Sequence, residues 1–170
     1  MPYQVAVCGP GRDCTEEDEE NAFRVGQLLA ECGVVVLCGG GAGVMAAAAA
    51  GARSKDGLVV GIRPDDSRVG APPDLSVTLV TGMGEARNVI IVWSADAVIA
   101  VGGSWGTLSE VALAKRRGGV PVISLCGWRV IDQDGRQLEG IEHVATPEEA
   151  VERAVASMTR RGDGGDADFV

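Results

Sequence analysis

Aromatic side chains are scarce in this sequence: Phe, Trp and Tyr make up 4% of its 170 residues, although 46% of the residues are hydrophobic. The core must therefore be built mainly from Val, Ala, Leu and Ile, a composition typical of a parallel sheet covered by helices. A chain of this length suits one domain with a sizeable core. We expect a single domain over residues 1–160 and a disordered tail over residues 161–170.

Positive charge is also in short supply. The chain has 15 Lys and Arg residues against 24 Asp and Glu residues, which gives a formal net charge of −9. Binding a polyanion normally needs a basic face, so we expect no nucleic-acid partner. Much of the acidity lies in residues 16–20, which we interpret as the solvated first turn of a helix.

Membrane-spanning and export signals are lacking as well. No apolar run approaches the roughly 18 residues needed to cross a bilayer, and no basic region precedes a long apolar stretch at the N-terminus. The five cysteines form no CxxC pair, and an odd number cannot pair completely within one chain. We therefore expect a cytoplasmic protein with reduced thiols, no membrane partner and no metal site. Cys8, Cys38 and Cys126 close apolar runs and are expected to be buried.

Short apolar runs alternate with segments of helical periodicity along the chain. Thr15 and Asp18 have the spacing of a capping box at the start of the first helix. Residues 63–74 and 127–140 are predicted loops, and the second loop has the turn chemistry of a small hairpin. Strands are predicted at residues 3–8, 34–38, 58–62, 77–80, 97–101 and 120–125, and helices at residues 15–32, 44–54, 85–93, 107–117 and 146–158.

Strands that alternate with helices at this spacing indicate βαβ units. We therefore predict an α/β fold, a single Rossmann-like domain in which helices cover both faces of a parallel twisted sheet. Such sheets bind ligands beyond the carboxyl ends of their strands, at the point where the strand order reverses. Two glycine-rich turns follow predicted strands in this way, at residues 39–43 and 102–106.

Both glycine-rich turns have the composition of phosphate-binding loops. Each precedes a predicted helix, whose N-terminal N–H groups and dipole attract an anion. Thr107, at the end of the second turn, either caps its helix or binds phosphate through its hydroxyl group. Trp105, inside that turn, is either a lid over a ligand or a stacking surface for a base.

Two charged residues are predicted to lie near these turns. Arg87 is placed at a third loop-to-helix junction on the same side of the sheet, and its guanidinium suits bidentate binding of phosphate. Glu110 is placed in the first turn of its helix, where the helix dipole favours an acid, although a carboxylate beside a sugar can also transfer a proton. His143 has no Ser or Asp partner in the sequence, and we assign it no catalytic role.

Three stretches resemble the LONELY GUY or "lysine decarboxylase-like" superfamily, over residues 4–125. They read GGGAGVM at residues 39–45, MGEARN at residues 83–88 and GGSWGTLSE at residues 102–110. The resembling phosphoribohydrolases have GGGxxGLM, MxxRK and PGGxGTxxE. Here Asn88 replaces the Lys, Gly102 replaces the Pro, Ser104 replaces a Gly, and the first turn is one residue shorter. These departures bring the chain closer to the branch that contains the molybdenum-cofactor carrier proteins.

This resemblance implies a Rossmann-like fold, a homodimer or higher homo-oligomer, and phosphate held by the glycine turns. In the hydrolases, residues matching Arg87 and Glu110 cleave the N-glycosidic bond of a nucleoside 5′-monophosphate, with Glu110 acting where an oxocarbenium-like centre develops. We expect no amino-acid decarboxylation, because Lys55 and Lys115 are the only lysines.

Three hypotheses for function follow. The first is a cytoplasmic nucleotide- or phosphate-cofactor-binding protein, such as a cofactor carrier, whose small phosphorylated ligand is a nucleoside monophosphate, phosphate or a molybdopterin-type cofactor. The second is a phosphoribohydrolase with Arg87 and Glu110 as catalytic residues. The third is a non-catalytic scaffold that dimerises through the apolar helix at residues 89–93. The predicted ligand-binding residues are Gly9, Gly39, Gly40, Gly41, Gly43, Met45, Arg87, Asn88, Gly102, Gly103, Ser104, Trp105, Gly106, Thr107 and Glu110.

Overall fold

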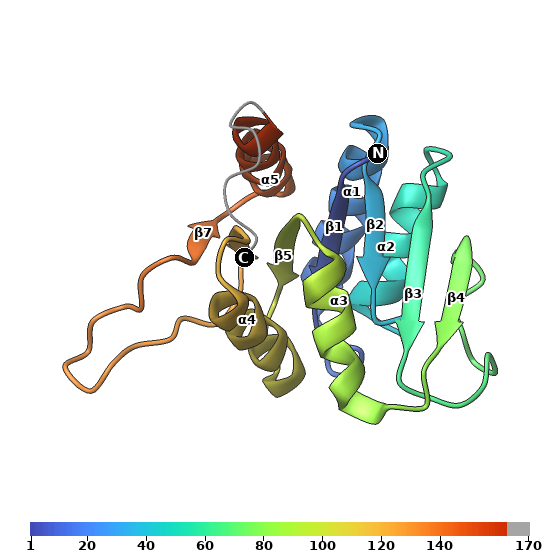
Figure 1. Cartoon of the computed structure of the whole chain (residues 1–170), viewed down its shortest axis with the longest axis horizontal. Helices are drawn as coiled ribbons and strands as arrows, with labels where there is room; N and C mark the ends of the chain where they lie inside the picture. The colour runs from blue at the N-terminus through green and yellow to red at the C-terminus, as the bar shows by residue number, and fades with distance from the viewer. Residues whose placement is uncertain (163–170) are drawn as a thin grey trace, which may run out of the picture.

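Seven parallel strands form one sheet in the order β4-β3-β2-β1-β5-β6-β7 (Figure 1). The computed structural model describes the backbone of residues 1–162 and the side chains of residues 1–159. The strands are β1 (Gln4–Cys8), β2 (Val35–Cys38), β3 (Val59–Arg63), β4 (Val77–Val80), β5 (Ala97–Val101), β6 (Val122–Leu125) and β7 (Glu142–Val144). The helices are α1 (Glu16–Glu31), α2 (Val44–Arg53), the 3₁₀ helix η1 (Gly84–Arg87), α3 (Asn88–Ser94), α4 (Trp105–Arg117) and α5 (Pro147–Gly162).

Each face of the sheet is covered by its own helices. In β1, Val5 and Val7 join the core under α1, α2 and α5, while Ala6 and Cys8 join the core under α3 and α4. This alternation follows from the two-residue period of a strand, and both sets are apolar because both faces are covered. Figure 1 shows α3 on the opposite side of the sheet from α1 and α2. The predicted α/β class and parallel sheet are confirmed.

The first two helices pack closely because glycines lie between them. A Cβ on Gly26 of α1 would meet the Ala48 carbonyl oxygen of α2 at 2.1 Å, and one on Gly51 would meet the Phe23 carbonyl oxygen at 1.9 Å. The predicted capping box is present at the start of α1. The Thr15 hydroxyl accepts a hydrogen bond from the Asp18 backbone N–H, and the Asp18 carboxylate accepts one from the Thr15 backbone N–H.

The strand order reverses at β1, because the chain passes from β1 to β2 and β3 on one side and later returns to β5 and β6 on the other. All strands are parallel, so their carboxyl ends meet at one edge of the sheet. The glycine turns after β2 and β5 therefore flank the turn at residues 9–11 after β1. This is the place where a sheet of this type is open to a ligand.

Some element boundaries differ from the sequence predictions. Helix α4 begins at Trp105, two residues early, because Ser104 is its N-cap. The predicted helix at residues 85–93 divides into η1 and α3. A small antiparallel bridge joins Ile131 and Gln137 in the predicted hairpin. Cys126 is exposed, contrary to expectation, because it lies in the turn after β6 with a φ of 53°.

The terminal helix was expected to end near Met158, but α5 continues to Gly162. The remainder of the tail predicted to be disordered, residues 163–170, lies outside the described residues. In the described part of the chain, no helix has the length and apolar character needed to cross a membrane.

Candidate ligand-binding site

Two adjoining hollows open at the carboxyl edge of the sheet. The larger has a volume of about 590 Å³ and the smaller about 150 Å³, and both are lined by Gly11, Met45, Glu85 and Arg87. The predicted residues that line the smaller hollow are Gly9, Met45, Arg87, Asn88, Ser104, Gly106, Thr107 and Glu110. The larger hollow adds Gly39, Gly40 and Gly41. The structure thus brings together most of the residues that the sequence singled out.

Arg87 lies between the two hollows. Its side chain is 12% exposed, and its Nη1 donates hydrogen bonds to the Asn88 side-chain oxygen and, at 3.4 Å, to Glu110 Oε1. A Cβ on Gly39 would meet Arg87 Nη2 at 2.4 Å, so this position must be glycine for the guanidinium to lie here. Among the described residues, the buried Nε of Arg87 has no hydrogen-bond partner. A buried cation with a spare donor is suited to an anionic ligand.

Glu110 is 7% exposed and lies in the second turn of α4, not in the first turn as predicted. Burial raises the pKa of Glu110 from 4.5 to about 7, although the Arg87 guanidinium and a hydrogen bond from the Cys8 thiol limit the rise. A favourable interaction with the helix dipole therefore does not explain why a carboxyl group occupies this buried position. Its two protonation states are both accessible near neutral pH, which suits proton transfer.

The N-terminus of α4 forms one wall of the smaller hollow. Ser104 accepts a hydrogen bond from the Thr107 backbone N–H at 3.1 Å, and the two hydroxyl oxygens lie 2.9 Å apart. Ser104 is therefore the cap, and Thr107 does not have the capping role that the sequence allowed. The first N–H groups of a helix have no acceptor within the helix and attract anions.

The first glycine turn is used partly for packing. Gly43 has a φ of 61°, and a Cβ there would meet the Pro10 carbonyl oxygen at 2.6 Å. The same oxygen accepts a hydrogen bond from the Val44 N–H at 3.1 Å, so the first amide of α2 is already occupied. Gly43 lines neither hollow, and its role is to bring the turns after β1 and β2 together.

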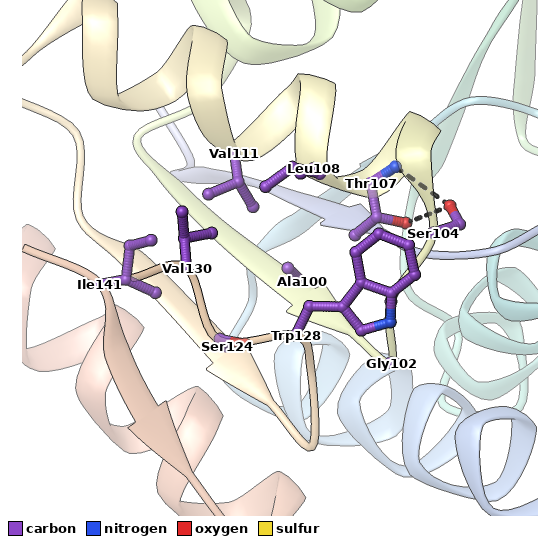
Figure 2. A pocket seen from close by; sticks show the side chains of 11 residues that line it. Ala100, Gly102, Ser104, Thr107, Leu108, Val111, Ser124, Trp128, Val130 and Ile141 are labelled. Carbon is purple, nitrogen blue, oxygen red and sulfur yellow. Dashed lines mark hydrogen bonds between the residues drawn. The ribbon is translucent and has the colours of Figure 1, made fainter. Parts of the chain in front are cut away.

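Part of the second glycine turn faces another cavity, shown in Figure 2. There Trp128 lies across from Ser104 and Thr107, and a Cβ on Gly103 would meet the Trp128 ring at 2.2 Å. Gly102 also lines this small cavity, whose other walls include Val111, Val130 and Ile141. Trp105 is 79% exposed and meets Trp128 edge-on, with the ring centroids 5.4 Å apart. Gly102, Gly103 and Trp105 therefore lie outside the two hollows.

Sequence reasoning missed Arg63, the last residue of β3. It is 7% exposed, and its Nη1 donates to the Gly40 carbonyl oxygen at 2.6 Å. An arginine that directly follows the apolar run at residues 58–62, and so lies at the carboxyl end of a predicted strand, was the available signal. His143 lies in β7 near the edge of the sheet, where burial and the charge of Arg129 lower its pKa, and it lines neither hollow.

Comparison with known proteins identifies a family and several similar structures. The model of the SLOG cluster4 family matches residues 2–151. An uncharacterised protein of Archaeoglobus fulgidus is 45% identical over 157 residues, which cover 92% of this chain and 97% of the relative. The chain is similar to the molybdenum cofactor binding protein of Rippkaea orientalis, with 37% identity, a TM-score of 0.84, and coverage of 92% of this chain and 97% of that one. It is also similar to the molybdenum cofactor carrier protein of Chlamydomonas reinhardtii, with 27% identity, a TM-score of 0.78, and coverage of 94% and 99%.

Proposed function

Because this chain belongs to the SLOG cluster4 family, we propose that it binds a small phosphorylated cofactor of the molybdopterin type and acts as its carrier. The observation that carries this proposal is the meeting of Arg87, the α4 N-terminus and two glycine turns around adjoining hollows. The names of the similar structures from Rippkaea orientalis and Chlamydomonas reinhardtii support the choice of cofactor.

The residues of the hollows fit such a ligand. The phosphate lies in the smaller hollow, where the Arg87 guanidinium neutralises charge and the Ser104 and Thr107 hydroxyls lie close by. The ring system lies in the larger hollow against Gly39, Gly40 and Gly41. A volume of about 590 Å³ is within the range of sites that enclose ligands of this size.

The test is thermal stabilisation by ligands. A ligand at 100 times its dissociation constant adds about 2.7 kcal/mol to the free energy of unfolding, which is readily seen as a higher melting temperature. We expect stabilisation by pterin phosphates or nucleoside monophosphates and its loss in Arg87→Ala. Arg24→Ala is the matched control, because Arg24 lies on α1 and pairs with Glu148. If inorganic phosphate and all phosphorylated ligands leave the melting temperature unchanged, the proposal is wrong.

A second candidate, cleavage of the N-glycosidic bond of a nucleoside 5′-monophosphate, is favoured by one observation. Glu110, with a pKa raised to about 7, adjoins Arg87 at the smaller hollow. Incubation with a panel of nucleoside monophosphates, followed by chromatography of the free base, tests it. Base release that disappears in Glu110→Gln and persists in Glu139→Gln supports a hydrolase, while no release with any substrate favours the carrier.

We further propose that the chain forms a homodimer through α3. This helix exposes two large apolar side chains, Val89 at 42% and Trp93 at 61%. Light scattering should give twice the chain mass for the wild type and a monomer for Trp93→Glu. A wild type that stays monomeric at micromolar concentration contradicts this proposal.

A further inference from the structure

A short segment at residues 64–70 walls the larger hollow, and Arg63 holds it in place. Besides its hydrogen bond to Gly40, Arg63 donates to the Ser67 carbonyl oxygen at 3.3 Å and to the Val69 carbonyl oxygen at 3.0 Å. Its Nη2 also pairs with the Asp65 carboxylate. One buried guanidinium therefore fixes the wall segment to the first glycine turn.

The wall segment is also attached to the chain that leads into Arg87. The Gly82 N–H donates to the Asp65 carbonyl oxygen at 2.9 Å, and the Gly84 N–H donates to the Pro64 carbonyl oxygen at 3.0 Å. Pro64, Asp65 and Gly70 line the larger hollow. The wall segment therefore has a fixed position relative to the first glycine turn and to Arg87. A surface that selects between ligands needs such a fixed position.

Asp65 presents an acceptor at this wall. Its side chain is 50% exposed, and its Oδ2 is taken by Arg63. Within the described part of the chain, its Oδ1 accepts no hydrogen bond. The ion pair restricts the carboxylate, so a ligand donor that reaches Oδ1 has less side-chain entropy to overcome.

Glu85 is the other carboxylate that lines the larger hollow. No ion pair or side-chain hydrogen bond in the described residues restrains it, and it lies on η1 beside Arg87. An unrestrained carboxylate in water contributes little selectivity. Asp65 is therefore the better candidate for recognising a specific group on the ligand.

We propose that Asp65 accepts a hydrogen bond from the ring amino group of a ligand with a 2-aminopyrimidin-4-one edge, the edge shared by pterins and guanine. This inference rests on the proposed phosphate site and names the ring class that the site selects. The phosphate in the smaller hollow fixes one end of the ligand, and Asp65 reads the amino group at the other end. A neutral ring that lacks the amino group leaves the carboxylate without this partner.

The test compares GMP with IMP, because these nucleotides differ only in the 2-amino group. Calorimetry on the full chain measures both dissociation constants, and inorganic phosphate reports on the phosphate site alone. We expect GMP to bind wild type about tenfold more tightly than IMP, as for one hydrogen bond to a charged group. In Asp65→Asn the ratio should fall to about threefold or less, because the acceptor loses its charge.

Asp66→Asn is the matched control, because Asp66 is the neighbouring acid, is exposed and lines neither hollow. Asp66→Asn should keep the wild-type ratio of the IMP and GMP dissociation constants. Glu85→Gln should change this ratio less than Asp65→Asn does. Equal binding of GMP and IMP to wild type overturns the inference without any variant. The inference is also overturned if Asp65→Asn and Asp66→Asn have the same ratio. Failure of both nucleotides to bind overturns the inference, and failure of inorganic phosphate and pterin phosphates as well overturns the proposed function.

Discussion

Replacement of Glu110 by Gln should change how the stability of the protein depends on pH. The Glu110 carboxyl group is buried in the fold with a pKa of about 7 instead of 4.5, because burial disfavours its charge more than Arg87 favours it. A group whose pKa is higher in the folded state stabilises the fold fully below pH 4.5 and loses that contribution as pH rises through 7. Glutamine has a similar shape and no such titration.

The size of the effect follows from proton linkage. With pKa values of 4.5 in the unfolded chain and about 7 in the fold, wild type should lose about 2–3 kcal/mol between pH 5 and pH 8 that Glu110→Gln does not lose. The contact with Arg87 does not titrate in Glu110→Gln, and its change with pH in wild type is already included in the folded-state pKa. For a domain of this size, the melting temperatures of the two proteins should diverge by about 5–10 °C over that range.

Urea unfolding followed by circular dichroism at pH 5, 6, 7 and 8 gives the two stability profiles. The free energy of wild type should fall relative to that of Glu110→Gln as pH rises. Glu139→Gln removes an exposed carboxylate from the loop before β7 and should follow wild type throughout. Parallel profiles for wild type and Glu110→Gln would refute the reasoning, since they would mean that Glu110 titrates alike in both states.

Three further predictions concern the frame around the site. Thr15→Ala should lower the free energy of unfolding by about 1 kcal/mol through loss of the capping box, measured by urea unfolding. Gly39→Ala should displace the Arg87 guanidinium with little loss in the free energy of unfolding, because the Cβ would meet only the far ends of the Arg87 and Met45 side chains, and should weaken stabilisation by phosphorylated ligands in thermal melts; an unchanged ligand response would contradict the steric argument. Burial raises the pKa of the Cys38 thiol to about 11 and also raises that of the Cys8 thiol well above its usual value, so neither should react with iodoacetamide at pH 8 in the folded protein, as intact mass and peptide mapping can check.

Local sequence patterns predicted much of the frame. Apolar runs of four to six residues located the strands, because β1, β2, β3, β5 and β6 are buried and closed by turns, while the exposed edge strand β4 still has three apolar residues in four. The Thr15 capping box was predictable because its hydrogen bonds join residues three apart. Arg87 and Glu110 were predicted to lie near the glycine turns because both follow strands of the same parallel sheet.

Features that depend on distant contacts were not predictable in the same way. The burial of Glu110 could not be predicted from its position near a helix start, which indicated an acid favoured by the helix dipole or one that transfers a proton beside a sugar. Cys8 and Arg87 reach it from other elements. Arg63 resembled the first polar residue of a loop, and its role depends on a glycine turn more than 20 residues earlier in the chain, where it bonds to Gly40. The predicted start of α4 was two residues late because glycine has a low helix propensity, so Gly106 was assigned to the turn and not to the helix.

The parallel sheet has a practical consequence for handling the protein. Met1 is fully exposed and lies at the end of β1 opposite the turn at residues 9–11 (Figure 1). A five-residue strand is about 15 Å long, so the amino terminus lies roughly that far from the hollows. Coupling the chain to a sensor chip through its amino terminus therefore leaves the hollows facing the solution. Maleimide chemistry gives mixed orientations, because two thiols are exposed among the described residues: Cys126 follows β6 at the edge where ligands are expected to enter, and Cys32 lies between α1 and β2 at the other edge.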